Sequence, residues 1–192
     1  MAAPQDDWSG PRPLATSAPI LVGGVLVLLL VTVLAVMLRR GVDVPSEVAA
    51  HYVALMAGTL QPGIETRDGE ALSRRIADPA LGFTPRVGEL GPEFALVGGG
   101  VHRLGERPAA FWYYRDRRAD VLLAEAFAGT LDDVGRPDEV RGEPPVPLHV
   151  FRKTTQTLVF WQEGTEVYVV TTTLPGERTI ALAQRLAAGS RP

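Results

Sequence analysis

The longest apolar run of the chain, PILVGGVLVLLLVTVLAVML at residues 19–38, limits its possible folds more than any other feature. At about 1.5 Å rise per residue, a helix over this run is about 30 Å long, the thickness of a bilayer's hydrocarbon core. Asp6 and Asp7 precede the run, and Arg39 and Arg40 follow it directly. The alternative, a cleaved signal peptide, has a basic start and a shorter apolar stretch. We therefore expect a retained membrane anchor.

This interpretation divides the chain into a short tail (1–18), a transmembrane helix (19–40) and an extramembrane domain (42–192). Gly23 and Gly24 are the positions where another membrane helix can approach closely. Hydrophobic residues make up 46% and charged residues 21% of the chain, which is enough for a packed core. The sequence contains no cysteine, which excludes disulfides, thiolate nucleophiles and cysteine-ligated zinc. The net charge of −3 gives no general reason to bind nucleic acid.

The extramembrane domain is expected to be an antiparallel sheet flanked by helices. Apolar residues recur at helical spacing in three segments, which predicts helices within 42–58, 68–79 and 175–188. Short segments rich in branched and aromatic residues predict strands. These segments are residues 93–98, 101–105, 108–115, 119–127, 146–153, 155–162 and 165–174. Because no long parallel crossover connects the central strands, the predicted class is α+β.

Neither the glycines nor the histidines form a recognisable catalytic motif. The run Gly98–Gly100 leads into another strand, whereas a phosphate-binding glycine loop leads into a helix. We expect it to be a turn with positive φ, or a bulge, between two strands. Glu47 and His51 have a spacing that suits a metal or a surface ion pair, and the ion pair is favoured because no second histidine is nearby. His102 and His149 lie on predicted strands without a fixed acidic partner. The expectation is a non-enzymatic protein without a cofactor or metal.

The aromatic run in the predicted strand 108–115 raises a different possibility. Neighbours on a strand point to opposite faces, so Trp112 and Tyr114 share one face and Phe111 and Tyr113 the other. One pair belongs in the core. The second pair needs a cover, which is either a helix of the same domain or a partner protein.

Residues 128–147 form an acidic, proline-rich excursion between predicted strands. Such a segment cannot form a strand interior, and it has little apolar surface with which to order itself. One hypothesis is a single partner-binding surface that joins aromatic rings to carboxylates, and the alternative is a solvated loop with internally covered rings. The residues of that hypothetical surface are Phe111, Tyr113, Asp132, Asp133, Asp138, Glu139 and Glu143.

The segment FALVGGGVHRLGERPAAFWYYR (94–115) resembles the extracytoplasmic domain of bacterial transmembrane anti-sigma factors. The resemblance extends to EVAAHYVALMAGTLQPGIETRD, LGFTPRVGELG and TLVFWQEGTEVYVVTTTLP, and covers about residues 45–187. The chain departs from that family in lacking the N-terminal sigma-binding domain with its zinc motif. Gly100 also stands where the family usually has arginine, and Phe111 and Tyr113 are bulkier than the usual residues.

The resemblance implies that the domain lies outside the cytoplasmic membrane of a bacterium, in the periplasm. Arg39 and Arg40 favour the opposite orientation, but long domains translocate largely regardless of nearby charge. The expected function is that of an accessory subunit, which contacts the bilayer and the subunits of a membrane protein complex. The alternative is an envelope-sensing regulator of an extracytoplasmic-function sigma factor system, and an enzyme is the third possibility. Direct binding of a sigma factor is not expected.

Overall fold

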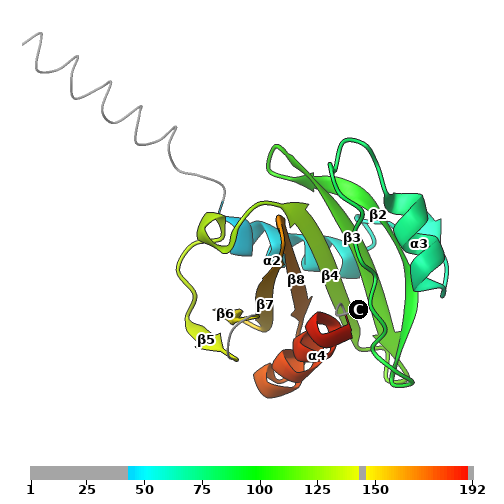
Figure 1. Ribbon diagram of the computed structural model, residues 1–192. Helices are drawn as coiled ribbons and strands as arrows, with labels where there is room; N and C mark the ends of the chain where they lie inside the picture. The colour runs from blue at the N-terminus through cyan, green and yellow to red at the C-terminus, as the bar shows by residue number, and fades with distance from the viewer. Residues whose placement is uncertain (1–42, 143–145, 190–192) are drawn as a thin grey trace, which may run out of the picture. The chain divides into compact units, whose positions relative to one another are not determined.

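An eight-stranded antiparallel sheet with helices on both faces makes up the domain (Figure 1). The computed structural model describes residues 43–142 and 146–189. Its elements are α2 (Val44–Met56), β1 (Ile64–Glu65), α3 (Gly69–Ile76), β2 (Phe94–Leu104), β3 (Arg107–Asp116), β4 (Val121–Ala128), the 3₁₀ turn η1 (Leu131–Asp133), β5 (Glu139–Arg141), β6 (Leu148–Lys153), β7 (Gln156–Glu163), β8 (Glu166–Thr172) and α4 (Gly176–Gly189). The predicted α+β class with an antiparallel sheet is confirmed.

The predicted tail (1–18), the predicted transmembrane helix (19–40) and its glycines Gly23 and Gly24 lie outside the described residues. Among the helices that are described, none has the length and apolar character needed to cross a bilayer.

The strand order β1-β2-β3-β4-β8-β7-β6-β5 consists of two antiparallel meanders that meet at the pair β4–β8. Because β4 is joined laterally to β8, the chain must leave the centre of the sheet after Ala128 and restart at the far edge with β5. The two edge strands, β1 and β5, are only two and three residues long. Short edges of this kind limit sheet-to-sheet aggregation.

The sheet separates two apolar layers, with α2 on one side and α3 and α4 on the other. Figure 1 shows α2 and α4 on opposite sides of the strands. Trp112 and Tyr114 belong to the layer under α3 and α4, which also holds Leu72 of α3 and Leu186 of α4. The opposite layer divides into two clusters, one with Val44 and Val48 of α2 and one with Tyr52 of α2, Phe111 and Tyr113. The predicted alternation of the aromatic run is therefore confirmed.

The glycine run does not form the turn that the sequence predicted. Gly98–Gly100 lie inside one continuous strand, β2, and none of them has a positive φ. The other expectation, a bulge, holds next to the run, where the pairing with β3 shifts register between Leu96 and Gly98. A Cβ on Gly98 would lie 2.2 Å from the carbonyl oxygen of Ile64, and a Cβ on Gly99 would lie equally close to that of Phe111. Close backbone approach, and not flexibility, accounts for these glycines.

The excursion 128–147 is ordered by its own contacts over the part that the structure describes, contrary to the prediction. Leu131 and Val134 are buried in the cluster beneath the N-terminal half of α2. Thr130 and Asp133 form a reciprocal capping box around η1. Part of the excursion is also a strand, β5, which pairs with β6 at the edge of the sheet. Two buried apolar side chains and a capped turn therefore supply the ordering contacts that the composition did not reveal.

Candidate functional site

A carboxylate with no solvent exposure lies at the centre of the sheet face that α2 covers. Glu125 of β4 is 0% exposed, and its side chain meets His51 of α2 and His102 of β2. The three residues, called the His–Glu trio below, come from three separate segments of the chain. They lie in the seam between the two apolar clusters that pack under the two halves of α2.

The distances within the His–Glu trio are short and nearly equal. His51 Nδ1 lies 3.3 Å from Glu125 Oε1 and 3.2 Å from Oε2. His102 Nε2 lies 3.2 Å from the same Oε2. The two imidazole rings meet edge to face with centroids 4.3 Å apart, and the ring of Phe111 packs edge to face against His102 at 5.2 Å.

His102 Nε2 and Glu125 lie within ion-pair distance of each other, but the geometry of their contact is not that of a hydrogen bond. The buried Nε2 of His102 makes no hydrogen bond within the described residues. The Oε2 of Glu47, one helical turn before His51, is likewise buried without a hydrogen-bond partner there. Buried polar atoms normally have a partner, and of the five described side-chain atoms that lack one, two lie on or beside this trio.

The electrostatics of the trio couple the carboxylate to both rings. Burial acts to raise the pKa of Glu125, but the adjacent His102 and His51 outweigh it and hold that pKa below its ordinary value. Burial acts to lower the pKa of His51, yet contacts with Glu125 and the charge of Glu47 raise it overall. Glu125 is thus held as a carboxylate beneath α2, with His51 favoured in its charged form.

Local sequence explains how these side chains reach one another. In β4 the alternation of the strand places Glu125 between Leu123 and Phe127 on the face under α2. On α2, His51 lies between Val48 and Tyr52, which are both buried against the sheet. The helix therefore presents the imidazole of His51 to the strands in the middle of an apolar stripe.

Two departures from the anti-sigma-like pattern are direct neighbours. Gly100 of β2 is paired with Phe111 of β3. A Cβ at Gly100 would lie 3.2 Å from Cε1 of the Phe111 ring. The absence of a side chain at position 100 leaves room for the large ring at position 111, and that ring in turn supports His102.

Phe111 and Tyr113 do not form an exposed partner surface. Their exposed fractions are 1% and 8%, and they pack with Tyr52 of α2. Of the two covers considered for these rings, the helix of the same domain is the one that the structure contains. The hypothesis that a partner covers them is therefore corrected.

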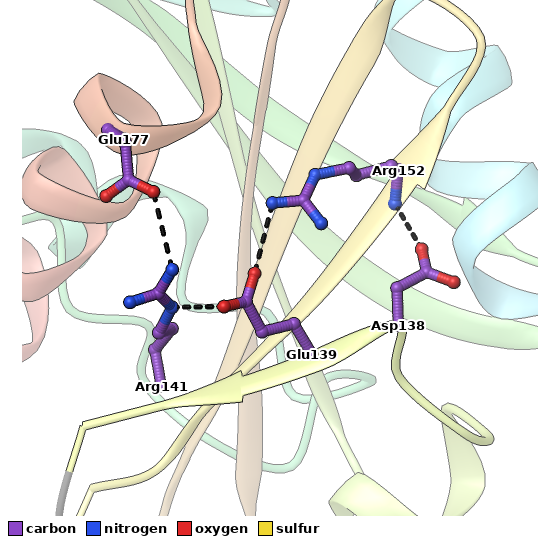
Figure 2. Close-up of polar contacts among 5 residues, drawn as sticks. All are labelled: Asp138, Glu139, Arg141, Arg152 and Glu177. Atoms are coloured by element: carbon purple, nitrogen blue, oxygen red, sulfur yellow. Dashed lines mark hydrogen bonds and ion pairs between the residues drawn. The ribbon is translucent and has the colours of Figure 1, made fainter.

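Three of the carboxylates proposed for the same surface already have partners within the domain. Asp133 is paired with Arg107 at 3.3 Å. Figure 2 shows Glu139 between Arg141 and Arg152, and Asp138 accepting a hydrogen bond from the backbone N–H of Arg152 at 2.7 Å.

In Figure 2, Arg141 also reaches Glu177 of α4, so the network joins the edge of the sheet to that helix. Asp132 is exposed, and Glu143 lies outside the described residues. The structure therefore does not unite the predicted surface: its rings are buried, and three of its carboxylates are engaged in internal contacts.

The outer side of α2 carries apolar residues that face solvent. Val53 and Met56 are 57% and 56% exposed, and Ala50 and Ala57 are exposed beside them. We call these four residues the α2 outer face. A helix that is apolar on both sides is usually covered on both sides. Sequence analysis predicted a helix within 42–58 but did not identify this exposed face.

Comparisons with protein-family models, with curated proteins and with solved structures give no significant match to this chain.

The sequence analysis did not predict the His–Glu trio, because its members are distant in sequence. Glu47 and His51 were considered together, but the residues that complete the cluster belong to β2 and β4. One signal was present: a glutamate inside the otherwise apolar strand VLLAEAFA. A charged residue at an inward position of a buried strand requires a partner.

Proposed function

We propose that the chain is a non-enzymatic, single-pass membrane protein whose domain 42–192 is an accessory subunit of a membrane protein complex. The observation that carries this proposal is the α2 outer face. It presents Val53 and Met56 to solvent on a helix that begins four residues after Arg40, the end of the predicted membrane segment.

The occupant that fits this face is an apolar helix of another subunit in the same membrane. Small and apolar side chains allow a partner helix to approach closely, and burying them releases water from apolar surface. A chain anchored through residues 19–40 would be confined near partners in the same bilayer. Such confinement raises the effective concentration of the partner and allows a small contact to suffice.

This function is tested by changing the α2 outer face alone. In affinity purification from native membranes, the double variant Val53→Ser/Met56→Ser is expected to recover about tenfold less partner, because the apolar contact is lost. Val140→Ser is the matched control, since Val140 is 53% exposed on the edge strand β5. Circular dichroism should show that both proteins remain folded.

Two outcomes would reject the accessory role through this face. One is equal recovery of partners by the double variant and the parent. The other is a photo-crosslinker at position 53 that joins the chain only to a second copy of itself.

A second candidate function is an envelope-sensing regulator of an extracytoplasmic-function sigma factor system. The observation that favours it is the His–Glu trio. This cluster holds α2, the helix that follows the predicted anchor, against the sheet. A change at the trio would alter how tightly α2 is held to the sheet, and the chain would transmit that change to the predicted membrane segment. The identity of the recovered proteins separates the two functions: sigma-system components favour the regulator, and subunits of a multisubunit complex favour the accessory role.

The proposed location of the domain is the periplasmic side of the membrane. This placement rests on the resemblance to anti-sigma factors and overrides the opposite preference of Arg39 and Arg40. An alkaline phosphatase fused after Pro192 is expected to be active, and a fluorescent protein that folds only in the cytoplasm is expected to stay dark. The reverse pattern would place the domain in the cytoplasm.

A further inference from the structure

We propose that His51, His102 and Glu125 bind a divalent transition-metal ion, with Zn²⁺ as the first choice. The ligands would be Nδ1 of His51, Nε2 of His102 and the carboxylate of Glu125. These ligand atoms all lie within 4.8 Å of one another in the described structure. Metal binding here is independent of any partner of the α2 outer face.

The spacing of the ligand atoms matches a tetrahedral zinc site. Zinc–nitrogen and zinc–oxygen bonds of about 2.0–2.1 Å at tetrahedral angles separate neighbouring ligand atoms by about 3.3 Å. The carboxylate Oε2 lies 3.2 Å from the ligand nitrogens of both His51 and His102. A histidine–carboxylate ion pair has similar distances, so a second observation distinguishes a metal site from an ion pair.

That observation is the unsatisfied hydrogen-bonding capacity at the site. The His102 side chain is 10% exposed, and its Nε2 lies 3.2 Å from the carboxylate Oε2 without making a hydrogen bond. A neutral imidazole can direct the lone pair of that nitrogen at a metal, which needs no hydrogen at that position. The buried, unpartnered Oε2 of Glu47 lies one turn from His51 on the same helix. Glu47 lies outside the set of ligand atoms that are within 4.8 Å of one another, so its role would be to hold a metal-bound water and not to bind the ion directly.

The donor types select the class of ion. Two imidazole nitrogens and a carboxylate suit zinc and its first-row neighbours, whereas Mg²⁺ and Ca²⁺ prefer all-oxygen sites. With neutral histidines, Glu125 and Glu47 contribute two negative charges, which balance a divalent cation. The buried charge of Glu125 would then be compensated by the metal, without protonation of either ring.

A metal at this place would join three elements that are distant in sequence. Its ligands come from α2, β2 and β4, so binding would fix the helix to the centre of the sheet. Free energy of metal binding to the folded state adds to the stability of that state.

The test uses the full chain, purified in detergent and stripped of metal with a chelator. Titration calorimetry is expected to show one Zn²⁺ per chain, and Co²⁺ is expected to give the visible absorption bands of a tetrahedral site. Mg²⁺ should give no heat of binding. Zinc at a hundredfold excess over its dissociation constant should raise the melting temperature by about 5–10 °C.

Four variants locate the site. Glu125→Gln and His102→Gln are expected to weaken zinc binding by about a hundredfold or more, and Glu47→Gln by about tenfold. The matched control is His149→Gln, because His149 is the third histidine of the chain and lies on β6, outside the trio. His149→Gln should bind zinc like the parent.

The proposal is overturned if the stripped parent binds no zinc, or if zinc binding is unchanged by both Glu125→Gln and His102→Gln. Loss of binding counts as support only for a variant whose circular dichroism spectrum matches that of the metal-free parent. Should both variants fail this check, Glu47→Gln and His149→Gln decide, since neither removes a member of the trio. Equal affinities of these two would also overturn the assignment.

Discussion

Replacement of Trp112, Leu158 or Phe160 by alanine is expected to lower the free energy of unfolding by about 3–5 kcal/mol. The three side chains are 2%, 0% and 0% exposed. They also sample both layers, because Trp112 lies under α3 and α4 while Leu158 and Phe160 lie on the side of α2. Truncation leaves a cavity that the surrounding strands cannot fill without distorting the sheet.

Trp112 is expected to have the largest effect of the three. Its ring packs edge to face on Tyr168 with centroids 6.3 Å apart, and its Nε1 donates a hydrogen bond to the hydroxyl of Tyr114 at 3.0 Å. That hydroxyl in turn donates to the carbonyl of Gly88, in the segment that leads from α3 to β2. Alanine at position 112 therefore removes a packed ring and one link of a buried polar chain.

Denaturant unfolding followed by circular dichroism measures these differences. Val140→Ala is the control, since a side chain that is 53% exposed should change stability by no more than about 0.5 kcal/mol. Total stability of a domain is typically about 5–15 kcal/mol, so the least stable variant is expected to be partly unfolded at physiological temperature. If all three variants melt within a few degrees of the parent, the described packing of the sheet is wrong.

The alternation of Trp112 and Phe111 could be predicted because it depends only on the period of a strand. The residues that cover each face could not, because strand pairing and helix placement depend on contacts between distant segments. For the same reason the cover of Phe111 and Tyr113 remained open between a helix and a partner. In the structure α2 covers both rings, and Tyr52 of that helix packs with them.

Two errors of the sequence analysis have one physical origin, the topology of the sheet. Gly98–Gly100 resemble a turn when read locally, but β1 and β3 approach Gly98 and Gly99 so closely that a side chain at either position would clash with a backbone oxygen. The excursion 128–147 resembles a solvated insertion, but the pairing of β4 with β8 requires a long connection to the far edge. Neither the close approach of the neighbouring strands nor the need for a long connection can be inferred from amino-acid composition.

The His–Glu trio shows a similar limit. Sequence reasoning could notice Glu125 within an apolar strand, yet it could not identify His51 and His102 as the residues beside it. Their meeting depends on the placement of α2 over β2 and β4, which is set by the apolar residues around them. The site is a product of the packing on both of its sides.

In metal-free protein, the double variant His51→Leu/His102→Leu is expected to lose about 3–5 kcal/mol of stability. Leucine has a volume close to that of histidine, so the change removes the partners of Glu125 more than it changes the packing. The carboxylate would then remain at 0% exposure without a compensating charge or hydrogen bond from either ring. The cost of an unpaired buried charge, and not a cavity, is the expected cause.

A third substitution identifies the cause. Adding Glu125→Leu to the double variant removes the orphaned charge, and more than half of the lost stability should return, because apolar residues can replace a buried ionic cluster at little net cost. His149→Leu is the control for the histidine-to-leucine change itself, since His149 is only partly buried and lies outside the trio. Thermal unfolding in the presence of a chelator gives all four values without a contribution from bound metal. A triple variant no more stable than the double would show that His51 and His102 stabilise α2 through packing, and that the charge of Glu125 is not what they compensate.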